Sequence, residues 1–331
     1  MTQSEGAARL YTTIEGPIRF ALLDWALETG LFDLCAEGRT AKAVADARGL
    51  DAGQVALVLR ALVAARFLEQ SAGVFHTAPD ILPFVVADGS RNLRENLRAM
   101  AGMRHAGLDD IADLLRPDRP APERPLFDAT HWDRAHGSLK AFHRAVAADA
   151  MEPCLVGLPE WTRAASLLEV GPGSAVLARR LLARRPELHI TLLDLPPVAD
   201  RIRVDTADLP VEVVAGSYND TLPEGPFDIV WCSMSLYFRD NGLQRLIERL
   251  ADLLAPNGVL VSFHEALHDA RTGPPEHVIG RLMPSLRQGD VSFAEGEIAD
   301  AMSDAGLADL ETQTVTTAFG RFRLDLARKR D

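Results

Sequence analysis

The sequence predicts an α/β protein with a second, mostly helical domain at its N-terminus. The first observation is the apolar run 167–170, which ends in a glycine turn and precedes a helical pattern, as a buried parallel strand and its helix do. The second is a further strand ending at Asp194, 21 positions after Gly173, about where a Rossmann-like unit places a carboxylate. The third is a run of helical patterns and a hairpin before residue 90.

Composition narrows the class of protein. The chain has 331 residues, of which 47% are hydrophobic and 25% charged, as in ordinary soluble proteins. Its net charge of −12 argues against nucleic acid or an anionic membrane as a partner. The three scattered cysteines predict reduced thiols, and neither a signal peptide nor an apolar run long enough to span a membrane is present, so we expect a cytoplasmic protein.

The N-terminal domain, residues 1–90, has the pattern of a winged helix. A helical pattern within 13–36, helices at 41–48 and 51–65, and a hairpin at 67–77 follow one another. DNA binding would need basic residues on the helix 51–65, which offers only Arg60, so we expect dimerisation instead.

The rest of the chain divides into a linker, 91–160, and a C-terminal domain, 161–331. The linker is predicted to be mainly helical, with a loop at 116–122. Beyond Asp194, the C-terminal domain is predicted to contain strands at 211–215, 227–233, 259–263, 309–317 and 320–328, and helices at 241–255 and 295–305. Together these elements predict a Rossmann-like, doubly wound sheet.

The glycine turn has an unusual acidic residue before it. Glu169, Gly171 and Gly173 are followed by Asp194, whereas Val176 replaces the third glycine of a dinucleotide motif. This order resembles the first motif of class I S-adenosylmethionine-dependent methyltransferases. The resemblance implies that S-adenosylmethionine lies over the glycines, with its ribose on Asp194 and its amino acid end near Glu169. Acidic side chains suit the cationic sulfonium and amino groups.

A second resemblance covers nearly the whole chain. Gly30–Asp33, Thr40, Leu57–Leu62 and Thr77 resemble the N-terminal dimerisation domain of plant-type O-methyltransferases and their bacterial natural-product relatives. The resemblance implies a homodimer that acts on a small molecule, with an antiparallel last strand. It also implies a set of residues around the cofactor, namely Leu195, Ser217, Tyr218 and Ser233. The substrate pocket it implies contains Phe142, His143, Met151 and Trp231.

The chain departs from that family at the catalytic base. The family's histidine corresponds here to Tyr237, and a neutral tyrosine is a poor base at neutral pH. The acceptor could already be acidic, for O-methylation or for C-methylation of an enol. Another group could serve as base, with His264, His268 and His143 as candidates and Glu265 facing the pocket.

Two further alternatives stay open for the function. The enzyme could act on S-adenosylmethionine itself, for example by cyclising it, with Tyr237 meeting the sulfonium through a lone pair or its ring face. The chain could also be a non-catalytic, cofactor-binding homodimer.

One rival motif is present at 264–268. His264, Glu265 and His268 fit the spacing of a zinc protease, which needs both histidines on one helix. The motif begins at the end of a β-branched strand, and the prolines at 274–275 leave little helix, so we expect no proteolytic zinc. A non-proteolytic metal at His264, His268 or His277 stays open, and our predicted site contains no metal ligand.

Overall fold

The structure, a computed structural model, describes residues 3–118 and 127–330, and the chain forms two compact units that divide after Arg98. Residues 99–160, which we expected to form a separate linker, belong to the second unit. The predicted loop at 116–122 lies partly outside the described residues. Among the described helices, none has the length and apolar content needed to cross a bilayer.

The first unit contains the predicted helices and hairpin. Its elements are α1 (Gln3–Glu28), α2 (Leu31–Leu34), β1 (Arg39–Thr40), α3 (Ala41–Arg48), α4 (Ala52–Ala64), β2 (Leu68–Ser71), β3 (Val74–Thr77) and α5 (Leu82–Val85). Thr40 and Asp51 cap α3 and α4 by accepting backbone N–H groups. The strands pair in the order β1-β3-β2, and Phe32, Leu59 and Phe75 lie in the apolar core.

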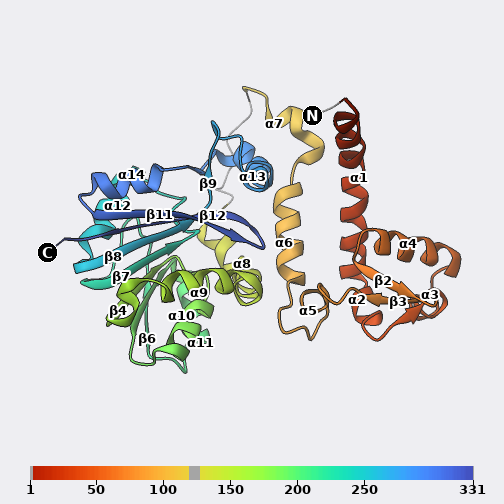
Figure 1. Cartoon of the computed structure of the whole chain (residues 1–331), viewed down its shortest axis with the longest axis horizontal. Coiled ribbons are helices and arrows are strands. Elements are labelled where there is room, and N and C mark those ends of the chain that lie inside the picture. Colours follow the sequence, from red (N-terminus) through yellow and green to blue (C-terminus); the bar gives the residue numbers. More distant parts are fainter. Residues whose placement is uncertain (1–2, 119–126, 331) are drawn as a thin grey trace. The chain divides into compact units, whose positions relative to one another are not determined.

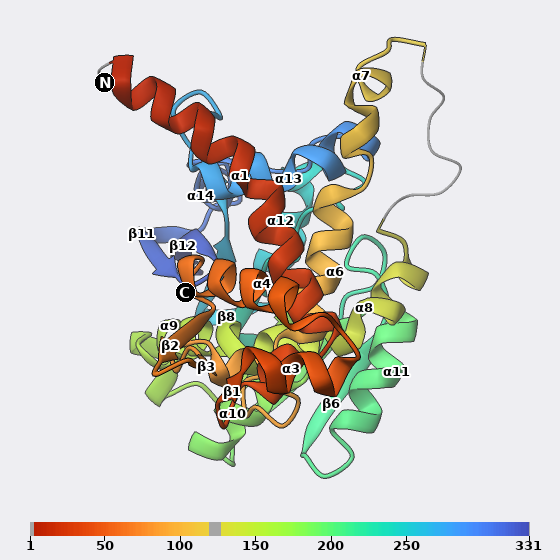
Figure 2. The same ribbon diagram turned by 90° about the vertical axis from the view of Figure 1, so that its right-hand side faces the viewer.

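Helix α1 begins ten residues before the predicted region 13–36. The small sheet and α4 lie beside its C-terminal half (Figure 2). Large apolar side chains on its N-terminal half and just beyond it are more than half exposed: Leu10, Tyr11, Ile14 and Ile18. Sequence periodicity understated α1 because this half buries no face within the first unit.

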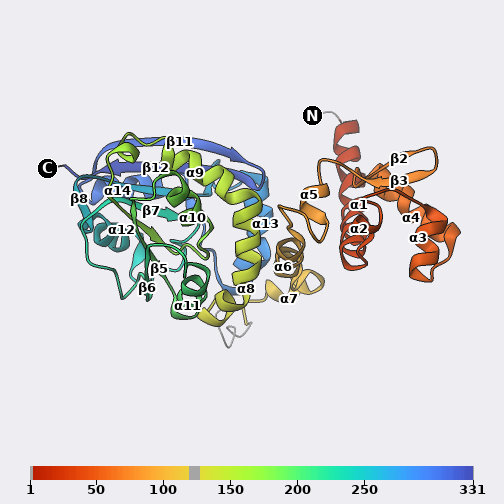
Figure 3. The same ribbon diagram turned by 90° about the horizontal axis from the view of Figure 1, so that it is seen from below.

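A seven-stranded sheet forms the centre of the second unit, in the order β11-β12-β8-β7-β4-β5-β6 (Figure 3). Its strands are β4 (Ser166–Val170), β5 (His189–Asp194), β6 (Val211–Ala215), β7 (Phe227–Ser233), β8 (Leu254–His264), β11 (Ala308–Thr317) and β12 (Gly320–Arg328). The strands from β6 to β8 are parallel, and β12 runs antiparallel to β8, as predicted. Strand β4 lies between β5 and β7, so the chain adds later strands on both sides of it. The carboxyl end of β4 is therefore the topological switch point, where sheets of this kind bind ligands.

Helices cover both faces of this sheet (Figure 1). On one face lie α9 (Ala148–Val156), α10 (Val176–Arg184) and α11 (Pro196–Asp205); on the other lie α12 (Gly242–Asp252) and α14 (Glu297–Asp304). The two faces of β4 supply the two cores, with Leu167 in one and Leu168 in the other. The alternation of side chains along a strand explains why the apolar run 167–170 is continuous.

The remaining helices come from the linker region and from the chain after β8. They are α6 (Arg94–His105), a 3₁₀ turn (Leu108–Asp110), α7 (Ile111–Leu114), α8 (Ala129–Phe142), a π-helical turn (His143–Ala147), a 3₁₀ turn (Pro159–Thr162) and α13 (Pro275–Gln288). Two short strands, β9 (Ala266–Leu267) and β10 (Phe293–Ala294), pair with each other. Helix α13 corrects our expectation of little helix after residue 271, because Pro275 stands at a helix N-terminus, where proline is favoured.

We predict that Leu59→Ala lowers the free energy of unfolding of the first unit by about 2–5 kcal/mol, because a fully buried side chain leaves a cavity. Leu59 is 0% exposed in α4, whereas Leu57 on the same helix is 54% exposed. The matched control Leu57→Ala should cost less than about 0.5 kcal/mol. Urea unfolding followed by Trp25 fluorescence measures both, and equal losses would contradict this packing.

Candidate active site

The turn after β4 has a backbone shape that favours glycine. Gly171 and Gly173 have φ angles of 67° and 64°, in the left-handed region. A Cβ on Gly171 would also lie 2.7 Å from the Cβ of Ser235. The Gly171 N–H donates to the Leu193 carbonyl at 2.8 Å, which ties the turn to β5. The turn therefore sits at the switch point of the sheet with its backbone close to the neighbouring loops.

Two buried carboxyl groups adjoin this turn. Asp194 accepts the N–H groups of Gly173 and Leu195, each at 2.8 Å. Burial raises the pKa of Asp194 to about 6, although these two N–H groups lower it. Glu169 is 2% exposed, and among the described residues its Oε2 has no hydrogen-bond partner. Burial, followed by the charge of Asp194, raises the pKa of Glu169 to about 8. An orphaned buried carboxyl suits a ligand that brings hydrogen-bond donors.

The loop after β6 supports the loop after β7. Tyr218 donates its hydroxyl to the Ser235 carbonyl at 2.9 Å and accepts the Phe238 N–H at 3.1 Å. Ser217 Oγ accepts the Asn219 N–H at 3.2 Å. Ser233 ends β7 and is buried. Tyr218 is therefore engaged with the chain around Tyr237, and its contact with a cofactor stays a prediction, as do those of Leu195, Ser217 and Ser233.

Tyr237 and Glu265 meet in a closed network with Arg281. The Tyr237 hydroxyl donates to Oε2 of Glu265, and the Arg281 guanidinium forms an ion pair with the same carboxylate. Arg281 Cζ lies 4.3 Å from the centroid of the Tyr237 ring. Burial raises the pKa of Tyr237 to about 12, against the opposing charge of Arg281. Arg281 therefore covers one face of the Tyr237 ring, the group that we had considered as a contact for the sulfonium of S-adenosylmethionine. Sequence reasoning missed Arg281 because it missed α13.

His264 is held by the backbone. Its Nε2 accepts the N–H groups of Ser235 and Leu236 at 3.0 and 3.1 Å, and its Nδ1 lies 2.8 Å from Ser262 Oγ. Two N–H donors on Nε2 place the ring proton on Nδ1. Burial, followed by the nearby arginine charges, lowers the pKa of His264 to about 3. His264 therefore stabilises the turn that precedes Tyr237. Its Nε2 lone pair already accepts these two N–H groups and is not available to accept a proton from a substrate.

Two histidines from α8 and its π-helical turn reach the glycine turn. His136 Nδ1 lies 3.0 Å from the Gly173 carbonyl oxygen, and His143 Nδ1 lies 2.7 Å from Ser174 Oγ. Burial, followed by the charge of His136, lowers the pKa of His143 to about 4. His143, which we had considered as a base or a pocket residue, thus contacts the residue after Gly173. His136 was missed because its sequence neighbourhood carries no motif.

The other residues expected to form the substrate pocket lie in or against the core. Met151 and Trp231 are 1% and 0% exposed within the core cluster that packs under α9 to α11, and Phe142 packs against that cluster. The Phe142 ring meets the Phe319 ring edge to face at 4.9 Å. Both side chains are buried in that cluster, and a contact of either one with a substrate stays a prediction.

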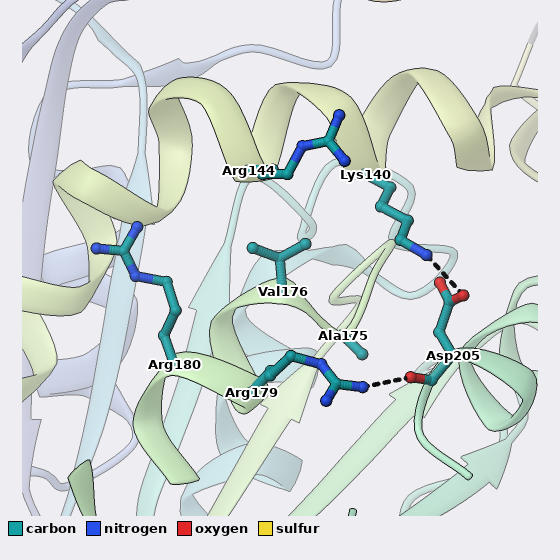
Figure 4. Close-up of a pocket in the computed structure, with 7 residues that line it drawn as sticks. All are labelled: Lys140, Arg144, Ala175, Val176, Arg179, Arg180 and Asp205. Atoms are coloured by element: carbon teal, nitrogen blue, oxygen red, sulfur yellow. Dashed lines mark hydrogen bonds and ion pairs between the residues drawn. The ribbon is translucent and has the colours of Figure 1, made fainter. Parts of the chain in front are cut away.

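A pocket of about 350 Å³ lies behind the glycine turn (Figure 4). Its walls come from α8, the π-helical turn, α10 and α11, and are formed by Lys140, Arg144, Ala175, Val176, Arg179, Arg180 and Asp205. It contains none of the predicted catalytic residues. The cations are largely matched by acids, since Lys140 pairs with Asp205 and Arg179 with Asp208. This pocket is therefore not part of the predicted catalytic site.

His264, Glu265 and His268 do not form a zinc site. His264 ends β8 and the chain continues into β9, so no helix brings the two histidines together. Across the described parts of the chain, no group of three or more histidine, cysteine or acidic side chains is arranged to hold a metal ion.

Comparison with known proteins matches the second unit to a family of enzymes. Residues 168–260 match the family model described as a methyltransferase domain. The chain is 28% identical over 178 residues to the tetracenomycin polyketide synthesis 8-O-methyl transferase of Streptomyces glaucescens, covering 50% of this chain and 52% of that protein. It is 24% identical over 312 residues to the mitomycin biosynthesis 6-O-methyltransferase of Streptomyces lavendulae, covering 89% and 87%. The chain thus spans about half the length of the first relative and most of the second.

Solved structures share the fold over the whole chain. An O-methyltransferase family protein from Burkholderia thailandensis has a TM-score of 0.79 at 22% identity, covering 100% of this chain and 99% of that one. Human N-acetylserotonin methyltransferase, in complex with S-adenosylmethionine, has a TM-score of 0.79 at 21% identity, with the same coverage.

Part of the second unit therefore matches a methyltransferase domain, and the chain is similar in sequence to O-methyltransferases. The fold is shared with these two methyltransferase structures over nearly the whole of each chain. The residues at the glycine turn fit the cofactor, because S-adenosylmethionine brings ribose hydroxyls and an amino group to the two carboxyl groups there. That Gly171, Gly173 and Asp194 hold the cofactor, with Glu169 near its amino acid end, stays a prediction.

We predict that Asp194→Ala weakens binding of S-adenosylhomocysteine at least about tenfold, because the ribose loses its acceptor and two backbone N–H groups lose theirs. Calorimetry with the product as ligand measures this affinity. Asp200→Ala on α11 is the control, since that carboxylate pairs with Arg203 at the surface. Unchanged affinity of Asp194→Ala would remove the ribose from this residue.

We predict that Glu169→Gln raises the melting temperature of the ligand-free protein at pH 8.5 but not at pH 4.5. The pKa of Glu169 is raised from 4.5 to about 8, so its stabilising contribution is complete below pH 4.5 and is lost as the pH rises through 8. An amide mimics the protonated acid and does not titrate. Differential scanning fluorimetry compares it with Glu212→Gln, an exposed control. An equal effect at both pH values would contradict the raised pKa.

Proposed function

We propose that this chain is an S-adenosylmethionine-dependent O-methyltransferase that modifies a small molecule of specialised metabolism. The observation that carries this proposal is the pairing of Tyr237 with Glu265 beside the glycine turn and its two carboxyl groups. Tyr237 follows β7 and Glu265 follows β8, so both stand at the carboxyl edge of the sheet where β4 presents the turn. The relatives named above act on polyketide and mitomycin scaffolds by name, which supports this substrate class.

Bound S-adenosylmethionine would supply a methyl group made electrophilic by the sulfonium. The chain's own contribution is to hold the acceptor oxygen in line with that group, and such alignment is worth roughly 7–11 kcal/mol. Because the Tyr237 hydroxyl donates its proton to Glu265, its oxygen keeps lone pairs that can accept a hydrogen bond from an acceptor hydroxyl. Tyr237 would therefore orient the acceptor.

Tyr237 stands where the family has its histidine base, but it does not act as a general base. Its raised pKa keeps it protonated, Glu265 is neutralised by Arg281, and both His264 and His143 have lowered pKa values and engaged ring nitrogens. A positioned general base raises the reaction rate roughly 10²–10⁴-fold. An acceptor that is already ionised at neutral pH needs no such base and loses least when the base is missing. We therefore propose that the preferred acceptor is a hydroxyl that ionises near neutral pH, such as that of a hydroxyquinone.

The proposed assembly is a homodimer. Helix α1 exposes four large apolar side chains in and just beyond its N-terminal half, Leu10, Tyr11, Ile14 and Ile18. A contiguous apolar face of this kind marks a protein contact. A second copy of this chain is the partner that the family resemblance favours.

Mass spectrometry of the purified enzyme tests the proposed reaction. We predict that S-adenosylhomocysteine forms with 2-hydroxy-1,4-naphthoquinone and that the donor stays intact without an acceptor. Methylthioadenosine accumulating without acceptor would show that the donor itself is the substrate. No product of any kind, together with normal binding of the donor, would favour a non-catalytic protein.

We predict that Tyr237→Phe lowers kcat at least about tenfold and leaves the affinity for S-adenosylhomocysteine within about twofold, because it removes one hydrogen bond at the acceptor and none at the cofactor. Asp200→Ala, which alters a surface carboxylate paired with Arg203 on α11, is the control and should leave both unchanged. Steady-state kinetics and calorimetry separate the two quantities. Normal turnover of Tyr237→Phe would show that Tyr237 only packs.

A further inference from the structure

Side chains from α8 and its π-helical extension contact the glycine turn. His136 and His143 lie two helical turns apart and contact consecutive residues, Gly173 through its carbonyl and Ser174 through its hydroxyl. Leu139, between them, would lie 3.3 Å from a Cβ on Gly173. The π-helical turn begins at His143, and such turns often occur at functional sites. The helix therefore holds the turn through the Gly173 carbonyl and the Ser174 hydroxyl, whereas Asp194 holds the Gly173 N–H.

His136 has an acceptor on each ring nitrogen. Its Nδ1 faces the Gly173 carbonyl oxygen at 3.0 Å, and its Nε2 faces Oδ2 of Asp205 at 3.1 Å. Carbonyl and carboxylate oxygens only accept hydrogen bonds, so both contacts are satisfied only when both nitrogens carry protons. A neutral ring would turn a lone pair toward one of the two oxygens. The imidazolium form is therefore the one that satisfies both contacts at once.

Asp205 anchors this imidazolium to α11. Its carboxylate also accepts the Lys140 ammonium at 2.6 Å, and its carbonyl accepts the Arg179 guanidinium at 2.8 Å (Figure 4). Both polar atoms of the Gly173 backbone are thereby fixed, its N–H by Asp194 and its carbonyl by His136. Gly173 is thus held by Asp194 at the end of β5 and by His136 on α8. The contact with His136 needs a proton on Nδ1 of the ring.

We propose that His136 is a positioning residue of the cofactor site, which as an imidazolium bound to Asp205 holds the glycine turn in the shape that binds S-adenosylmethionine. Affinity for the cofactor is therefore linked to the second ring proton. The inference rests on the assignment of the turn to this cofactor. The titratable and charged groups that surround His136 are Lys140 and His143 on its own helical segment, Asp194 at the end of β5, Asp205 on α11 and Arg179 on α10.

Calorimetry with S-adenosylhomocysteine at pH 6 and pH 8.5 tests the proposal on wild type and His136→Asn. Asparagine can still donate an N–H to the Gly173 carbonyl but carries no charge for Asp205. Wild type should bind about tenfold more tightly than His136→Asn at pH 6, since a charge-assisted bond is lost, and within about twofold at pH 8.5. Glu169 is present in both proteins, but the charge of His136 also lowers the pKa of Asp194, so the ratio reports His136 together with its effect on Asp194.

Two further variants keep the test decisive. Asp205→Asn leaves the ring in place but removes the charge that retains its second proton, and it should lose the same pH-dependent part of the affinity. His189→Asn changes a largely exposed histidine at the start of β5 and should match wild type at both pH values. Circular dichroism confirms that each variant is folded.

The outcomes separate the inference from the proposed function. A wild-type to His136→Asn ratio that is the same at both pH values, or a ratio of one, would overturn the proton-linked role while leaving the methyltransferase assignment in place. If wild type bound no S-adenosylhomocysteine at either pH, the assignment of the turn would itself fail.

Discussion

The position of one residue, Gly173, is the constraint on which the cofactor site depends. Its backbone has a left-handed conformation, which glycine adopts without strain. Its N–H is held by Asp194 and its carbonyl oxygen by His136. A fixed turn spares the cofactor the entropy of ordering a loop on binding. The cost is a group of ionisable side chains packed around a turn, including a carboxyl, Glu169, whose buried oxygen lacks a partner. A cationic, donor-rich ligand is the natural complement of that arrangement.

The acceptor side is organised by hydrogen bonds between successive loops at the same edge of the sheet. His264 holds the backbone before Tyr237 through two N–H groups, and Tyr218 holds the backbone on both sides of it. Tyr237 then donates to Glu265, which Arg281 neutralises from α13. Each group is satisfied by another, so the network is rigid and holds no spare base. A rigid, base-free site is suited to positioning an acceptor that loses its own proton easily.

Sequence reasoning succeeded where a local pattern determines structure. The strand 166–170, the glycine turn and Asp194 were predicted because apolar continuity, glycine spacing and strand length are local signals. It failed for α13, whose start at Pro275 was taken as a break, and therefore for Arg281. It also missed His136, because the value of that residue comes from Gly173 and Asp205, which lie 37 and 69 positions away. The contact of Met151 and Trp231 with a substrate stays a prediction, because spacing alone does not tell which side chains face a ligand.

A crystal structure with S-adenosylhomocysteine bound is the most direct test of the central claim, that the pinned glycine turn is the cofactor site. The account predicts the ribose hydroxyls within hydrogen-bond distance of Asp194, the amino group beside Glu169, and the His136 contact to the Gly173 carbonyl retained. A nucleoside bound away from this turn, with Glu169 still without a partner, would contradict it.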